Sequence, residues 1–164
     1  MKKITFITIA ILLFSMISFG QTDSTQVDLG NEMTKMLNTK ISMEVDSQLY
    51  KNSQGNFYIS EKPQAMIMAM VIPQSYEKAK EKLSEDVKKK NVVIKNAGEF
   101  EVNGKKIGFK TGEMKENGEN MIIELYVVEA TKENTIFITG VYLPTDKLRF
   151  ANSAKKAAST AKLE

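Results

Sequence analysis

The chain contains short runs in which apolar and polar residues alternate, and this pattern predicts strands. Residues 92–102 and 107–111 alternate in this way on either side of Asn103-Gly104. An Asn-Gly pair between two such runs is a strong signal of a β-hairpin, because a type I′ turn needs positive φ at both central residues. A second pair, Asn117-Gly118, predicts the next reversal. We therefore expect antiparallel strands from residue 92 to residue 143.

Two further segments are apolar on both faces of a strand. Residues 65–72 (AMIMAMVI) are all apolar, and residues 121–128 (MIIELYVV) are interrupted only by Glu124. Such runs suit strands that are covered on both sides, although periodicity alone leaves a buried helical segment open for 65–72. We expect 65–72 to be a central strand of the sheet.

The residues before position 65 give weaker signals for strands. Ile41, Met43 and Val45 alternate with polar residues and predict a half-buried strand, and residues 57–60 predict another. Residues 47–56 are mostly polar and end in a Gln-Gly-Asn turn signal, so we expect a loop there.

Two stretches have the spacing of amphipathic helices. One begins near Ser75 and places four apolar residues on one stripe: Tyr76, Ala79, Leu83 and Val87. The other follows Pro144 and has an alanine-rich side, which we expect to comprise Leu148, Ala151, Ala154, Ala158 and Ala161. With short turns between the strands, the expected fold class is α+β: a mostly antiparallel sheet with helices on both faces, an α/β/α sandwich.

The first 20 residues, MKKITFITIAILLFSMISFG, have the regions of a secretory signal peptide. Lys2 and Lys3 precede an apolar run, and small residues stand before a polar segment at the expected cleavage site near Gly20. A retained membrane anchor is the alternative, but serines interrupt the run. We expect a mature protein that is periplasmic or secreted and not embedded in a membrane. The predicted organisation is a signal peptide (1–20), a flexible leader that could form a short helix (21–39) and one α+β domain (40–164).

Charge and missing residue types narrow the function. Removing the signal peptide with its two lysines lowers the formal net charge from +3 to +1, so neither a nucleic acid nor an acidic membrane is expected as a partner. The chain has no His and no Cys. This excludes thiolate nucleophiles, His bases, Ser-His-Asp triads, disulfides and ordinary zinc sites. We expect no cofactor and a monomeric protein.

The order of predicted elements resembles the PsbP-like fold family. Two local patterns carry the resemblance, AMIMAMVIPQSYEKAKEKL at the step from strand to helix and FEVNGKKIGF at the hairpin. It extends over residues 40–163, nearly all of the mature chain. The family includes the photosystem accessory protein PsbP, the yeast Ran-binding Mog protein and bacterial DcrB-type periplasmic proteins. The resemblance implies a non-catalytic domain that docks on another macromolecule, and it carries over no partner.

Three methionines could bind a soft metal ion. Met66, Met68 and Met70 are spaced by two, so on a strand their thioethers point to one face and could hold Cu(I) or Ag(I). Methionine is also an adaptable core residue, and this run is apolar throughout. We favour core packing and keep the metal site as an alternative.

Four other residues are candidates for binding. Glu124 is the one charge inside an apolar strand, so we expect it to line a pocket or to pair with a buried lysine. Tyr50, Phe57 and Tyr58 flank the loop 47–56, where exposed aromatic side chains could anchor a partner. Glu124 is also the carboxylate on which an enzyme alternative depends, because a pair of carboxylates can perform acid-base chemistry when one of them is desolvated.

The sequence thus favours an exported binding or accessory domain over an enzyme. We expect a protein or envelope partner. A small carboxylate-based hydrolase with Glu124 in its cleft is one alternative, and a copper- or silver-handling protein is the other.

Overall fold

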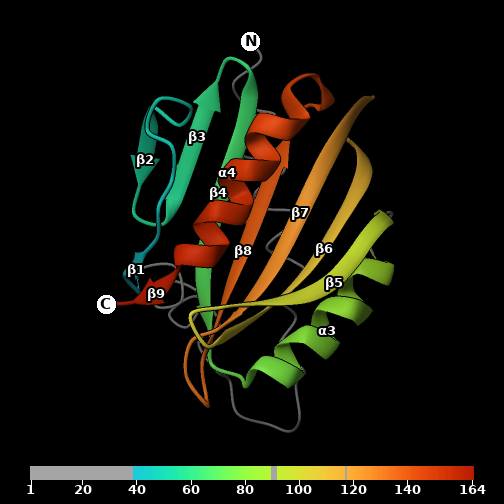
Figure 1. The fold of residues 1–164 in the computed structure, drawn as a ribbon. Helices are drawn as coiled ribbons and strands as arrows, with labels where there is room; N and C mark the ends of the chain where they lie inside the picture. Colours follow the sequence, from blue (N-terminus) through green and yellow to red (C-terminus); the bar gives the residue numbers. More distant parts are fainter. Residues whose placement is uncertain (1–38, 90–91, 117) are drawn as a thin grey trace, which may run out of the picture.

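A seven-stranded antiparallel sheet is the middle layer of the computed structural model, which describes residues 39–89, 92–116 and 118–164. The strand order is β2-β3-β4-β8-β7-β6-β5 (Figure 1). The strands are β2 (Asn52–Gln54), β3 (Phe57–Glu61), β4 (Gln64–Ile72), β5 (Val93–Val102), β6 (Lys105–Glu116), β7 (Glu119–Glu129) and β8 (Thr135–Tyr142). Strands β5 to β8 form the predicted meander, and β4 joins it through β8.

Two helices cover opposite faces of this sheet. Helix α4 (Lys147–Thr160), preceded by the 3-10 turn η1 (Pro144–Asp146), crosses the front of the sheet in Figure 1, and α3 (Tyr76–Lys89) lies behind it. After α4, the short strand β9 (Lys162–Leu163) pairs with β1 (Ile41–Ser42) in a small second sheet. The predicted α+β fold class, with helices on both faces of an antiparallel sheet, is confirmed.

The side chains of β4 show how each strand serves two cores. Its residues alternate between the faces because successive side chains of a strand point in opposite directions. Ala65, Ile67, Ala69 and Val71 belong to the core under α4, and Met66, Met68, Met70 and Ile72 belong to the core that includes α3. Every residue from 65 to 72 is buried, which explains why the sequence shows no alternation here. The predicted strand, covered on both faces, is confirmed.

The predicted hairpin at Asn103-Gly104 is also confirmed. Asn103 has φ 52° and Gly104 has φ 75°, and the flanking residues Val102 and Lys105 are cross-strand partners. These two positive φ values are the ones that a type I′ turn requires. The turn brings Lys105 to the end of α4, where its Nζ donates a hydrogen bond to the carbonyl oxygen of Ala161 at 3.3 Å.

Three expectations need correction. The expected loop 47–56 contains the edge strand β2, which pairs with β3 across a turn at Gly55, where φ is 58°. The strand predicted from Ile41 to Val45 is reduced to β1, which pairs with β9 outside the main sheet. In α4, Leu148 is 76% exposed, whereas Phe150, Ser153 and Ala157 are buried.

The N-terminal predictions lie almost entirely outside the described residues. The signal peptide (1–20) and all of the leader (21–39) except Thr39 belong to the part that is not described. In the described ranges, no helix is long and apolar enough to cross a membrane.

Helix α4 lies close to the sheet over Gly140 of β8. A Cβ atom added at Gly140 would stand 3.0 Å from the Cβ of Ala154 and 3.8 Å from the Cβ of Glu124. The contact with Ala154 is tighter than ordinary van der Waals packing, so glycine is needed here for the close approach of helix and strand.

Gly140→Ala is therefore expected to push α4 outward and to lower the free energy of unfolding by about 1–3 kcal/mol. Urea denaturation measures this change. Asn152→Ala on the exposed side of α4 is the control, with an expected change below about 0.5 kcal/mol. Equal effects of the two substitutions would contradict the close fit.

Candidate functional site

Glu124 is the one acidic or basic side chain that is buried among the described residues, with 4% exposure. It lies on β7, on the face covered by α4, and its direct cross-strand neighbours are Gly140 on β8 and Thr111 on β6. Because Gly140 has no side chain, the carboxylate has room to lie beneath the helix. Glu124 is therefore held in an apolar layer in which its oxygens need hydrogen-bond donors.

Two tyrosine hydroxyls supply these donors. Tyr142 donates to Oε1 of Glu124 at 2.7 Å, and Tyr126 donates to Oε2 at 2.6 Å. Tyr126 follows Glu124 by two residues and therefore shares its face of β7. Tyr142 comes from β8, where it is paired with Ile122 and is thus diagonal to Glu124. The predicted partner, a buried lysine, is wrong: the carboxylate is satisfied by phenols.

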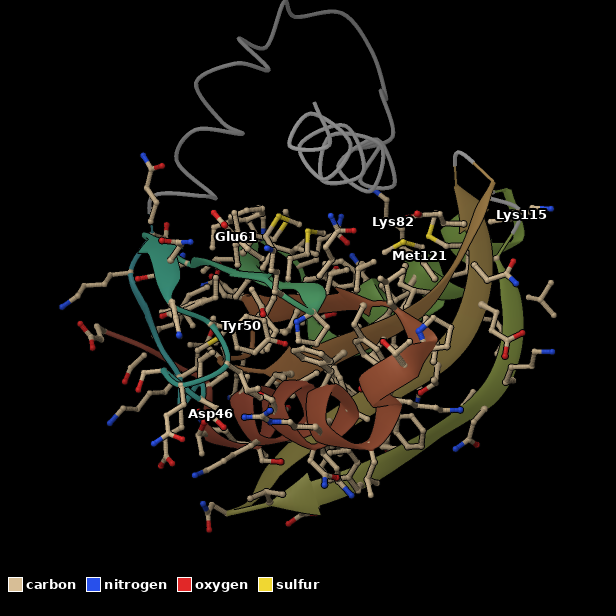
Figure 2. The ribbon with its side chains drawn as sticks, turned by 90° about the horizontal axis from the view of Figure 1, so that it is seen from above. Asp46, Tyr50, Glu61, Lys82, Lys115 and Met121 are labelled. Carbon is tan, nitrogen blue, oxygen red and sulfur yellow. The ribbon has the colours of Figure 1, made fainter. Side chains whose placement is uncertain are left out.

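Tyr50 and Ser153 complete a polar cluster around this carboxylate. Tyr50 comes from the loop beside α4 (Figure 2), and its ring packs edge-on against Phe150 at a centroid distance of 5.9 Å. The hydroxyls of Tyr50 and Ser153 are neighbours, yet both are buried and neither makes a hydrogen bond of good geometry. We call these five residues, Glu124, Tyr126, Tyr142, Tyr50 and Ser153, the Glu124 cluster.

The phenols of the cluster are held in their neutral form. Burial, reinforced by the hydrogen bonds and the charge of Glu124, raises the pKa of Tyr126 and of Tyr142 far above the ordinary value. Burial also raises the pKa of Tyr50, with a smaller opposing effect of Ser153 and a further increase from the charge of Glu124. Neutral phenols are the donors that a carboxylate requires.

The cluster is closed to solvent in this conformation. Both carboxylate oxygens of Glu124 are engaged, and α4 covers the side chain from above. A catalytic carboxylate must come within hydrogen-bond reach of its substrate. Glu124 could do so only after α4 has moved.

A cleft of about 370 Å³ lies elsewhere, between the β1–β9 sheet and the β2–β3 turn. Its lining residues are Lys40, Ile41, Ser42, Met43, Gly55, Asn56, Tyr58 and Glu164. It thus combines apolar side chains with a charged pair, Lys40 and Glu164, which form an ion pair at its exposed edge. Glu124 is not among the lining residues, so this cleft does not meet the pocket prediction for Glu124.

Asn56 fixes the geometry of the cleft. Its Oδ1 accepts a hydrogen bond from the backbone nitrogen of Ile41 at 3.2 Å, and its Nδ2 donates to the carbonyl oxygen of Thr39 at 2.7 Å. Its own carbonyl oxygen accepts from the backbone nitrogen of Ala69 on β4. Through these bonds, a single buried amide joins β1 to the main sheet.

The structure separates the residues that the sequence singled out. Tyr50 is 4% exposed and joins Glu124, so the expectation that it is an exposed aromatic is wrong. Tyr58 is half-buried and lines the cleft. Phe57 is half-buried on the other face, where it pairs with Met68. The binding roles of these residues stay predictions.

The three methionines lie in the core on the α3 side. Met66, Met68 and Met70 are 0%, 3% and 1% exposed and pack among aliphatic and aromatic residues. Met121 belongs to the same core, on the opposite side of the sheet from Tyr50 (Figure 2). The copper hypothesis stays a prediction. No group of three Asp or Glu side chains in the described ranges is placed to hold a metal ion.

Sequence reasoning missed three members of the cluster. The period of two along β7 could have identified Tyr126 as a neighbour of Glu124. Tyr142 and Ser153 carried no such signal, because their positions depend on the β7–β8 register and on how α4 docks.

Comparisons with known proteins identify the fold. No protein-family model and no curated protein sequence matches the chain. Among solved structures, LpqN of Mycobacterium tuberculosis, described as involved in cell envelope biogenesis, is similar with a TM-score of 0.59 and 10% identity. The match covers 75% of this chain and 82% of LpqN. PA94 of Pseudomonas aeruginosa, a protein of unknown function described as a putative regulator, has a TM-score of 0.52 and 11% identity, with coverage of 74% and 81%.

A PsbP protein is also among the similar structures. The solution structure of the cyanobacterial PsbP (CyanoP) of Synechocystis has a TM-score of 0.46 and 6% identity, with coverage of 89% of this chain and 99% of that protein. The fold that the order of the predicted elements indicated, an antiparallel sheet with helices on both faces, is shared with LpqN and PA94. At these identities the likeness concerns the fold alone.

Tyr142→Phe is expected to lower the free energy of unfolding by about 1.5–3 kcal/mol, because it leaves Oε1 of Glu124 buried without its donor. Denaturant unfolding monitored by circular dichroism measures the change. Tyr58→Phe is the matched control: its hydroxyl makes no hydrogen bond within the described residues, and we expect a change below about 0.5 kcal/mol. A similar loss in both variants would refute the role assigned to the Tyr142 hydroxyl.

Stability is also expected to fall at alkaline pH. In the unfolded chain the phenols lose their protons near their ordinary pKa of 10.0, whereas burial keeps Tyr50, Tyr126 and Tyr142 protonated in the folded protein. Above that pH the unfolded state binds fewer protons, so the free energy of unfolding decreases as pH rises. The decrease reaches up to about 1.4 kcal/mol per pH unit for each phenol.

Tyrosinate absorbance during an alkaline titration tests this prediction. Burial and the hydrogen bond to Glu99 also raise the pKa of Tyr76. We therefore expect the three phenols of the cluster and Tyr76 to ionise together with the loss of the circular dichroism signal, and Tyr142→Phe to remove one of these four from that step. Ionisation of all tyrosines before unfolding would contradict the burial of the cluster.

Proposed function

We propose that the protein is an exported, non-catalytic accessory domain of the cell envelope that acts by binding a protein partner. The observation that carries this proposal is the closure of the Glu124 cluster. Glu124, the carboxylate that the hydrolase alternative requires, is covered by α4. Both of its oxygens accept hydrogen bonds from tyrosines. A structural role for Glu124 leaves a binding domain as the best-supported function.

The location rests on two lines of support. The N-terminal 20 residues have the pattern of a cleaved signal peptide. LpqN, which has the same type of fold, is described as involved in cell envelope biogenesis. The mature domain is thus proposed to work outside the cytoplasm, in the periplasm or beyond it.

The cleft beside β1 is the proposed docking place. Tyr58, Ile41 and Met43 give it apolar surface, and the Lys40–Glu164 pair gives it a charged edge. Such a site suits a partner that inserts an apolar side chain and makes polar contacts at the rim, which is the usual arrangement of protein interfaces. The hydrolase alternative, in contrast, requires Glu124 to open to solvent.

A photo-crosslinking residue in place of Tyr58, introduced in living cells, tests the docking place. We expect a covalent adduct with one protein of the envelope fraction. The same residue in place of Lys78, which is exposed on α3 and so on the opposite face of the sheet from Tyr58, is the control and should give no such adduct.

Two results would overturn the proposal. One is the same pattern of adducts, or none, at both positions. The other is turnover by the purified protein in a broad hydrolase screen that Glu124→Gln abolishes while the variant stays folded.

A further inference from the structure

Helix α4 carries a one-sided excess of positive charge. Between Lys147 and Thr160 it has four basic residues and no acidic residue. These residues, Lys147, Arg149, Lys155 and Lys156, are all exposed. Since the mature chain has a formal net charge of only about +1 after loss of two signal-peptide lysines, this excess is local to the helix.

Most of this charge is not neutralised within the described residues. Lys156 forms an ion pair with Glu44 at 2.8 Å, and Lys155 lies 5.2 Å from the ring centroid of Phe100. Lys147 and Arg149 form no ion pair with a described side chain. Among the described side chains, three cations of α4 therefore have no carboxylate partner and are exposed.

An exposed leucine stands among these cations. Leu148 is 76% exposed, directly between Lys147 and Arg149. At helical spacing it shares the outermost line of α4 with Asn152 and Lys155. The small residues of α4 therefore face the sheet. Its outer side is not purely polar, because it combines basic residues with one large apolar side chain.

This combination fits a lipid surface better than a protein. Protein interfaces have an apolar core from which charged residues are depleted, whereas here charges surround a single leucine. Basic side chains on a helix are attracted to anionic headgroups, and an apolar side chain on the same side enters the boundary between headgroups and acyl chains.

We propose that the outer face of α4 binds the surface of a bilayer that contains anionic phospholipids. The contact is peripheral: Lys147, Arg149 and Lys155 meet the lipid phosphates, and Leu148 enters the interfacial layer. This goes beyond the proposed function, because it assigns a second surface and a second class of partner. None of these four residues lines the cleft, so the two proposals fail independently.

Sedimentation with lipid vesicles tests the proposal. The protein is expressed as the full chain and purified after the cells have processed and exported it. The vesicles contain phosphatidylcholine alone, or phosphatidylcholine with about 30% phosphatidylglycerol, at about 0.05 M and 0.5 M salt. We expect binding to the anionic vesicles at low salt, weak binding at high salt, and weak binding to phosphatidylcholine alone.

The variant Lys147→Gln/Arg149→Gln/Lys155→Gln is expected to lower the vesicle partition coefficient about a hundredfold, since each cation near an anionic surface contributes about fivefold. Leu148→Gln, which leaves the charge unchanged, is expected to lower it about tenfold. The double variant Lys147→Gln/Arg149→Gln leaves Lys155 in place over Phe100 and is expected to lower it about twenty-fivefold if the triple variant is unstable.

The matched control has the same loss of charge at exposed lysines outside α4 and the loop beside it: Lys78→Gln/Lys115→Gln/Lys132→Gln. It should bind within about threefold of the unchanged protein, because the screened field of distant charges contributes little. Equal losses in the control and the α4 variant would overturn the proposal. Binding that does not depend on phosphatidylglycerol would also overturn it. A lack of binding to both kinds of vesicle would overturn it as well, and would leave an acidic protein as the occupant of this face.

Discussion

The burial of one carboxylate between the sheet and α4 constrains much of this structure. Glu124 needs donors for both of its oxygens in an apolar layer, and two strands must supply them in register. Tyr126 is placed by the period of β7, whereas Tyr142 is placed by the pairing of β7 with β8. Loss of the tyrosine hydroxyls, or a shift in the pairing of β7 with β8, would leave the buried charge of Glu124 without a partner. Such a change is among those that lower the free energy of unfolding most.

The same requirement determines how α4 lies on the sheet. Space for the carboxylate is provided by Gly140, and the lack of a side chain there also allows Ala154 to approach the strand. The inner side of α4 therefore consists largely of small residues, which pack closely but bury little apolar area each. Phe150 is the exception, stacked on Tyr142 at a centroid distance of 5.7 Å. This ring and the close fit at Gly140 anchor a helix whose outer side is left with its cations and Leu148.

The sequence predicted the elements whose signals are local. Asn103-Gly104 defined a hairpin because its backbone conformation depends on two adjacent residues, and the apolar run 65–72 defined a strand covered on both faces. The edge strand β2 was missed because its residues are polar and exposed, so hydrophobic periodicity gave no signal. Leu148 was assigned to the buried stripe from its spacing to Ala151, yet the helix turns Phe150 inward instead. The Glu124 cluster depends on strand register and helix docking, which a single sequence does not encode locally.

The two proposed surfaces are linked through the end of α4. The helix ends at Thr160, and β9 follows at once to pair with β1, the strand that lines the cleft. Thr160 Oγ1 also accepts a hydrogen bond from the backbone nitrogen of Glu44 at 2.8 Å, and Lys156 pairs with the carboxylate of the same residue. Because these contacts fix the cleft relative to α4, a helix that rests on a bilayer would hold the cleft beside that bilayer in one orientation. A partner at the membrane would then meet a cleft that is already oriented toward it, which reduces the rotational freedom lost on binding.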